Sequence, residues 1–170
     1  EKHIVSATVA PQRMTFALSR SAAFQERAPA TGKVVFIGAG PGDPELLTLK
    51  GRRLLSQADV VIYAGSLIPE AVLQHAPATA TLHNSAPLTL EQVMDLMRTA
   101  VRAGKLVVRL QSGDLSLYSA IQEQMTVLDQ EGIAYEAIPG ISAFQAAAAV
   151  LHSELTVPEV VQTIILTRGE

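Results

Sequence analysis

Four segments rich in small residues follow apolar runs of the sequence, and they are the best candidates for a binding site. They are Gly38–Asp43, Tyr63–Leu67, Gln111–Tyr118 and Pro139–Ala143. Small residues let a backbone approach a ligand closely, so these segments favour the positioning of a small molecule. The sequence has no cysteine, and its four histidines do not fall at metal-ligand spacing. We therefore predict a ligand site without a metal, and we assign no catalytic residue.

The first segment partly matches the dinucleotide-binding pattern G-x-G-x-x-G. Gly38 and Gly40 follow an apolar run and precede a predicted helix, but Asp43 takes the place of the third glycine. Its carboxylate can cap that helix and would repel a pyrophosphate at the helix N-terminus. The second predicted strand ends at Tyr63 without an acidic residue that could bind a ribose. A phosphate-free adenosyl ligand fits this loop better, and a dinucleotide remains an alternative.

The elements that must position these segments alternate regularly from Lys33 onward. Predicted strands cover 34–37, 60–63, 79–83, 106–110, 135–138 and 163–167, and predicted helices cover 44–55, 69–74, 89–103, 117–130 and 142–151. This order predicts an α/β fold with an open, mostly parallel sheet and flanking helices. Ligands bind such sheets beyond the carboxyl ends of the strands, where the four segments would lie together.

The composition is typical of a compact globular chain and excludes several classes of partner. Of the 170 residues, 48% are hydrophobic and 17% are charged, which is enough apolar material to bury a core. The formal net charge of -3 gives no electrostatic footprint for nucleic acid. No apolar run approaches the roughly 18 residues of a membrane span. Because chains without cysteine suit a reducing compartment, we expect a cytoplasmic protein without nucleic-acid or membrane partners.

Five stretches of the sequence together resemble the tetrapyrrole methylase family. They read VVFIGAGPGDPELLTLKG, ADVVIYAGSLIP, SAPLTLEQV, VVRLQSGDLSLYSAIQEQ and IPGISAFQAAAAVLHSELTVPEVVQTIILTR, and they extend from Lys33 to about Arg168. The resemblance implies transfer of a methyl group from S-adenosylmethionine to a tetrapyrrole. The segments Tyr63–Leu67 and Ser85–Thr89 are most similar to the precorrin-4 (or cobalt-precorrin-4) C11-methyltransferases of cobalamin synthesis. The family also implies two facing α/β domains, usually in a homodimer.

The resemblance further implies which residues bind the ligands. The positions that match the family's cofactor loops are Pro41, Ser112, Gly113, Asp114, Leu117, Ser142 and Ala143. A precorrin carries many carboxylates, so we expect cations near it, and Arg109 and Tyr118 are candidates for substrate contact. Lys50, Arg52 and Arg53 are also available, but a helix that carries three cations is most often a solvated face. Arg109 could equally be a structural ion-pair partner.

The sequence departs from the family in one loop and in its extent. The family's Gly-Asp-Pro is Gly113-Asp114-Leu115 here, and a frequent glycine is replaced by Ser119. The predicted domains are an N-terminal extension or linker over 1–32, an α/β domain over 33–157 and the start of a second, truncated domain over 158–170. We expect such a chain to bind its cofactor weakly and to be inactive alone. The alternatives are another α/β nucleotide-cofactor enzyme and a non-catalytic folding or dimerisation module.

Overall fold

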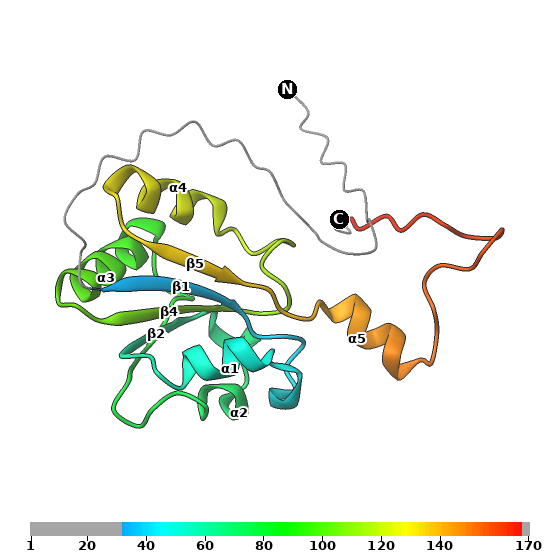
Figure 1. Cartoon of the computed structure of the whole chain (residues 1–170), viewed down its shortest axis with the longest axis horizontal. Coiled ribbons are helices and arrows are strands. Elements are labelled where there is room, and N and C mark those ends of the chain that lie inside the picture. Colours follow the sequence, from blue (N-terminus) through cyan, green and yellow to red (C-terminus); the bar gives the residue numbers. More distant parts are fainter. Residues whose placement is uncertain (1–31, 168–170) are drawn as a thin grey trace, which may run out of the picture.

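The computed structural model describes residues 32–167, which contain one five-stranded parallel sheet (Figure 1). Its strands are β1 (Lys33–Gly38), β2 (Val60–Tyr63), β3 (Thr81–Asn84), β4 (Leu106–Gln111) and β5 (Tyr135–Ile138). They lie in the order β3-β2-β4-β1-β5, and all four neighbouring pairs are parallel. The structure thus confirms the predicted α/β fold with an open parallel sheet.

Helices cover both faces of this sheet. The helical elements are η1 (Pro44–Leu46), α1 (Leu49–Leu55), η2 (Gly65–Leu67), α2 (Glu70–Leu73), α3 (Leu90–Arg102), α4 (Gln122–Glu131) and α5 (Ala143–Val150). In Figure 1, α3 and α4 lie on one face and α1 and α2 on the other. Alternate residues of β1 point to the two faces, so Phe36 packs in the cluster that contains Met94 of α3 and Ile37 packs in the cluster that contains Leu55 of α1. A strand covered on both sides reads as a continuous apolar run.

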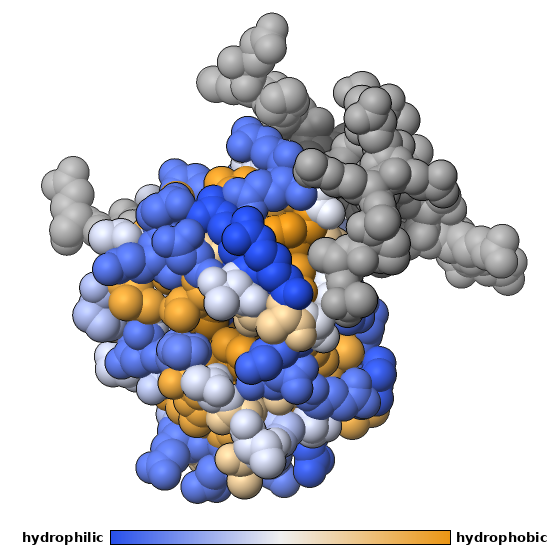
Figure 2. Space-filling view, turned by 90° about the vertical axis from the view of Figure 1, so that its left-hand side faces the viewer, coloured by the Kyte–Doolittle hydropathy of each residue, from blue (hydrophilic) through white to orange (hydrophobic). Residues whose placement is uncertain are grey.

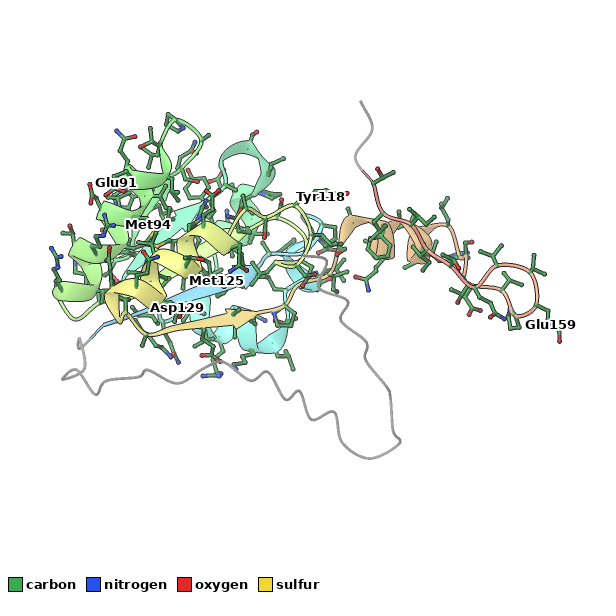
Figure 3. All side chains as sticks on the ribbon, turned by 90° about the horizontal axis from the view of Figure 1, so that it is seen from above. Glu91, Met94, Tyr118, Met125, Asp129 and Glu159 are labelled. Atoms are coloured by element: carbon green, nitrogen blue, oxygen red, sulfur yellow. The ribbon has the colours of Figure 1, made fainter. Side chains whose placement is uncertain are left out.

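Helix α3 carries the clearest local signals. Thr89 and Gln92 form a capping box, in which the Gln92 amide donates to Thr89 Oγ1 at 3.3 Å and the Thr89 amide donates to Gln92 Oε1 at 2.9 Å. One side of the helix is buried, and Figure 3 shows Met94 facing the layer that also contains Met125 of α4. Arg98 joins the two helices, because its Nη2 lies 2.7 Å from Glu131 of α4.

Two predicted helix boundaries are wrong. The helix predicted over 44–55 is interrupted, because Leu47 and Thr48 are extended and Thr48 caps a new helix by accepting from the Gly51 amide at 3.1 Å. The helix predicted from Leu117 begins only at Gln122, because Tyr118 and Ala120 adopt left-handed backbone conformations with φ of 53° and 52°. Left-handed residues end a right-handed helix, and neither residue type predicts them.

The predicted strand 163–167 is also wrong. Residues 162–167 have no regular structure, and helix α5 extends away from the sheet without a buried residue (Figure 1). A strand needs a neighbour for its backbone groups, and no strand of the described residues reaches this one. Several apolar residues of this region are consequently exposed, among them Val150, Leu151, Val160 and Ile165.

The opposite end of the molecule, turned away from α5, has a mixed surface on which hydrophilic side chains lie between apolar areas (Figure 2). The predicted extension or linker 1–32 lies outside the described residues except for Gly32.

Replacing Thr89 by alanine tests the capping box. Thr89→Ala removes the acceptor for the Gln92 amide, and we expect the free energy of unfolding to fall by about 0.5–2 kcal/mol in urea denaturation. The control is Thr126→Ala, because the Thr126 hydroxyl in the middle of α4 donates to the Gln122 carbonyl of its own helix and caps no helix end. That control should leave stability nearly unchanged. Equal losses in the two variants would contradict the assignment of Thr89 as the cap.

Candidate functional site

The predicted cofactor loops meet at the carboxyl edge, the edge of the sheet where the parallel strands end. The strands β1 and β4 are neighbours in the sheet. The connection from β1 to β2 nevertheless passes over one face of the sheet, through α1, and the connection from β4 to β5 passes over the other face, through α4. Such a reversal leaves a crevice beyond the two strands, where ligands of open α/β sheets bind. The loops that follow β1, β4 and β5 all lie at this point.

Three glycines hold these loops in direct backbone contact. A Cβ atom added to Gly140 would lie 2.2 Å from the Gly113 carbonyl oxygen and 2.6 Å from that of Gly38. A Cβ atom on Gly38 would lie 2.6 Å from the Gly140 amide nitrogen. Gly40 and Gly113 also exchange two backbone hydrogen bonds, of 2.7 and 3.1 Å. We call Gly38, Gly113 and Gly140 the glycine contact, since no other residue fits at Gly38 or Gly140 without displacing backbone.

Asp114 fastens this contact. Its Oδ2 accepts from the Gly140 amide at 2.9 Å, and its Oδ1 accepts from the Ser116 amide at 2.9 Å and from the Ser116 hydroxyl. Partial burial acts to raise the pKa of Asp114, but hydrogen bonds from Ser116, Gly140 and Leu115 outweigh it and hold the pKa below its usual range. The carboxylate therefore stays charged and joins the β4 loop to the β5 loop.

A hollow of about 370 Å³ opens at the loop that follows β4, and its lining includes Leu115, Ser116, Tyr118 and Met125. Tyr118 is 63% exposed and lies between the sheet and α5 (Figure 3). Its left-handed backbone is a costly conformation of the kind that concentrates at binding sites. A larger hollow, of about 760 Å³, follows the edge strand β3 and α3 but contains none of the predicted site residues. We therefore place the candidate site at the carboxyl edge.

The structure brings most of the predicted cofactor residues together. Gly113 is part of the glycine contact, and Asp114 bonds to the Gly140 amide of that contact. Ser112 precedes them in the sequence, and Ser142 is buried at the start of α5. Pro41, Leu117 and Ala143 lie in the same three loops with part of their surface accessible. The sequence analysis did not assign Gly38, Gly140 or Ser116 to the site. The glycines carried a signal, because one stands at the end of β1 and one stands two residues after the end of β4 and of β5.

The predicted substrate cation Arg109 lies inside the sheet. It is 6% exposed on β4, and burial lowers its pKa to about 10. Its Nη1 donates to the Ile62 carbonyl at 3.3 Å and to Ser85 Oγ at 3.0 Å, and its Nε donates to Gln124 Oε1 at 3.3 Å. All of these acceptors are neutral oxygens. Among the described residues, Arg109 therefore forms hydrogen bonds rather than the structural ion pair that the sequence analysis left open.

The three other candidate cations, Lys50, Arg52 and Arg53, lie on helix α1 at the surface. Lys50 is exposed and pairs with Glu136, while Arg52 and Arg53 line a surface hollow together with His75. Within residues 32–167, no cluster of three or more histidine, aspartate or glutamate side chains could hold a metal ion. The same part of the chain has no helix that is long and apolar enough to cross a membrane.

Comparison with known proteins identifies a family to which this sequence is similar. The family model of the tetrapyrrole (corrin/porphyrin) methylases matches residues 33–170. The chain is 53% identical over 138 residues to a cobalt-precorrin-4 C(11)-methyltransferase of Methanocaldococcus jannaschii, and the match covers 81% of this chain and 53% of the relative. It is 54% identical over 135 residues to a precorrin-4 C(11)-methyltransferase of Pseudomonas aeruginosa, covering 79% of this chain and 54% of that one. The chain thus spans about half the length of the curated relatives it matches.

Solved structures agree with this match. The X-ray structure of a cobalt precorrin-4 methyltransferase superimposes with a TM-score of 0.80 at 45% identity, covering 83% of this chain and 59% of the other. A uroporphyrin-III C-methyltransferase of Thermus thermophilus, solved in complex with S-adenosylhomocysteine, superimposes with a TM-score of 0.62 at 38% identity and covers 69% of this chain and 52% of the other. With its parallel sheet and its matched segment of 33–170, the chain belongs to the tetrapyrrole methylases.

Proposed function

We propose that this chain contributes the S-adenosylmethionine-binding edge of a methyltransferase that methylates precorrin-4 or cobalt-precorrin-4 at C11. The observation that carries the proposal is the identity of 53–54% to two enzymes named for this reaction, over 138 and 135 residues. Both the metal-free and the cobalt-containing substrate appear among these relatives, so the proposal covers both. We further propose that the protein acts in the cytoplasm as a homodimer, as predicted from the sequence.

The residues at the glycine contact suit this cofactor better than a dinucleotide. Carboxylates stand in two of the loops, since Asp43 caps η1 through the Glu45 amide at 2.9 Å and Asp114 fastens the contact. Negative side chains disfavour a pyrophosphate at these positions but tolerate a cationic sulfonium. A Cβ atom built on Gly113 would meet only Ser142 Cα, at 3.9 Å, so a ligand can approach this backbone.

The proposed cofactor residues are those of the three loops: Pro41, Ser112, Gly113, Asp114, Leu117, Ser142 and Ala143. When bound, S-adenosylmethionine supplies a methyl group on a positively charged sulfur. The chain's contribution is to orient and desolvate rather than to supply a strong base, because transfer to carbon demands alignment of the reacting atoms. The left-handed turn at Tyr118 and the glycine contact give the loops the fixed shape that alignment requires.

The cofactor assignment predicts the outcome of calorimetric titration. S-adenosylhomocysteine should bind a full-length protein that carries this sequence, and should bind the 170-residue chain more weakly, because the chain spans about half the length of its relatives. NADH is the control ligand and should give no saturable binding. Absence of binding by S-adenosylhomocysteine to the full-length protein, or saturable binding of NADH, would refute the assignment.

A pair of aspartate variants separates the site from its surroundings. Asp114→Ala removes the acceptor of the Gly140 and Ser116 amides, so we expect the dissociation constant of S-adenosylhomocysteine to rise about tenfold. Asp43→Ala removes a cap and should chiefly lower the free energy of unfolding, by about 0.5–2 kcal/mol. Calorimetry and urea unfolding measure the two effects. The reverse order of binding losses would mean that the β1 loop, rather than the β4 loop, holds the cofactor.

The lowered pKa of Asp114 predicts a pH dependence of stability. Because the carboxyl is more acidic in the folded chain than its usual value of 3.8, its contribution is fully present above that value and is lost as the pH falls toward the lowered pKa. We therefore expect the stability difference between wild type and Asp114→Asn to be larger at neutral pH than at about pH 3. Urea unfolding at both pH values measures it, and a difference that grows on acidification would contradict the assigned hydrogen bonds.

A further inference from the structure

A second set of loops lies at the carboxyl edge beside the glycine contact. These are the segments Tyr63–Leu67, after β2, and Asn84–Leu88, after β3. The two segments touch, since a Cβ atom on Gly65 would lie 2.8 Å from Ala86 Cβ and 3.3 Å from Asn84 Oδ1. Ser66, Leu67, Ala86 and Pro87 are exposed along them. In the sheet order, β4 separates these loops from β1 and β5, so they border the proposed cofactor site on one side only.

A chain of hydrogen bonds fixes these two segments to the sheet. Ser85 donates twice to the Tyr63 carbonyl, from its amide at 2.9 Å and from its hydroxyl at 2.8 Å. Since the hydroxyl proton is used there, the Ser85 oxygen is free to accept, and Arg109 Nη1 donates to it at 3.0 Å. Arg109 also donates to Ile62 on β2 and Gln124 on α4. The guanidinium therefore joins β2, the segment after β3 and α4.

The burial of Arg109 is energetically unfavourable, so its role must lie in the directed hydrogen bonds that it makes. A buried cation is disfavoured by desolvation, and the hydrogen bonds of Arg109 within the described residues run to neutral oxygens. Arg109 also lies beside Gln124, in the first turn of α4, where a helix disfavours positive charge. An apolar side chain would fill the same space at lower cost. Only a planar group with several fixed donors can hold Ile62, Ser85 and Gln124 at once.

We propose that Arg109 and Ser85 are positioning residues that set the shape of the substrate-facing loops, Tyr63–Leu67 and Asn84–Leu88, for a tetrapyrrole. The inference rests on the proposed function for the identity of that substrate. The cofactor loops follow β1, β4 and β5, so the remaining loops of the same edge are the ones left to contact the methyl acceptor. Arg109 acts through Ser85 and the backbone, without contact to the substrate.

The decisive variant is Ser85→Ala, which removes the hydroxyl that links Arg109 to the Tyr63 carbonyl and leaves Arg109 itself in place. In a full-length methyltransferase that carries this sequence, we expect the KM for cobalt-precorrin-4 to rise about tenfold, while the dissociation constant of S-adenosylhomocysteine changes by less than about twofold. Ser85→Thr keeps the hydroxyl and should restore the KM. Arg109→Lys keeps the charge but loses the fork of donors, and it should raise the KM as Ser85→Ala does.

Hydrogen exchange gives a readout that does not depend on activity. In the 170-residue chain, Ser85→Ala should speed exchange of the backbone amides of Tyr63–Leu67 about tenfold, because the Tyr63 carbonyl loses one of its two bonds to Ser85. The matched control is Ser56→Ala, whose hydroxyl donates to the Arg53 carbonyl at the end of α1, and it should change neither exchange nor KM.

The outcomes separate this inference from the proposed function. If Ser85→Ala leaves both the exchange of Tyr63–Leu67 and the KM unchanged, or weakens S-adenosylhomocysteine binding as much as it raises the KM, the positioning role is wrong. If the wild-type enzyme binds no S-adenosylhomocysteine and methylates no tetrapyrrole, the proposed function is wrong and the substrate role falls with it. Faster exchange in Ser85→Ala together with an unchanged KM also overturns the substrate role.

Discussion

The contact between Gly38, Gly113 and Gly140 is the constraint on which the candidate site depends. Carbonyl and amide groups of three loops approach so closely that a methyl group at Gly140 would lie 2.2 Å from the Gly113 oxygen. Such a contact requires the ends of β1, β4 and β5 to hold their register, and it fixes where the following loops begin. Asp114 then secures the arrangement from outside, through the Gly140 amide. The precision of the site is thus a property of backbone packing, with side chains added to it.

The charges near this contact bear on the kind of ligand it can hold. Asp43 and Asp114 both have their carboxylates engaged by backbone amides, the groups that would otherwise bind a phosphate. A loop that satisfies its own amides with carboxylates offers a ligand neutral backbone and small side chains instead. The dinucleotide alternative requires those amides to be free, whereas a sulfonium cofactor does not, so local chemistry and the family agree.

Residue type and spacing predicted the capping box of Thr89, which depends on local interactions alone. They also predicted the strand Tyr135–Ile138, and this prediction holds because the segment finds β1 as its partner in the sheet. The late start of α4 was not predicted, because Tyr118 adopts a left-handed backbone that its residue type disfavours and that only the surrounding loop can impose. The strand predicted over 163–167 failed for a related reason, since an apolar extended run becomes a strand only where another strand pairs with it. The cofactor residues predicted in the β4 loop came from the family resemblance, while the contact of this loop with Gly38 and Gly140 required the sheet order.

The carboxyl edge is therefore built by two different means on the two sides of β4. Toward β1 and β5 the loops are held by glycines in backbone contact, which leaves little freedom for substitution because a Cβ atom at Gly38 or Gly140 displaces main chain. Toward β2 and β3 side chains add to a backbone bond, because the Ser85 hydroxyl and Arg109 reinforce the link between the Ser85 amide and the Tyr63 carbonyl. Under the proposed function, the loops after β1, β4 and β5 meet the cofactor, and those after β2 and β3 meet the methyl acceptor. In the role we propose for it, the buried cation of the middle strand β4 orders the loops after β2 and β3, because its donors reach Ile62, Ser85 and Gln124 at once.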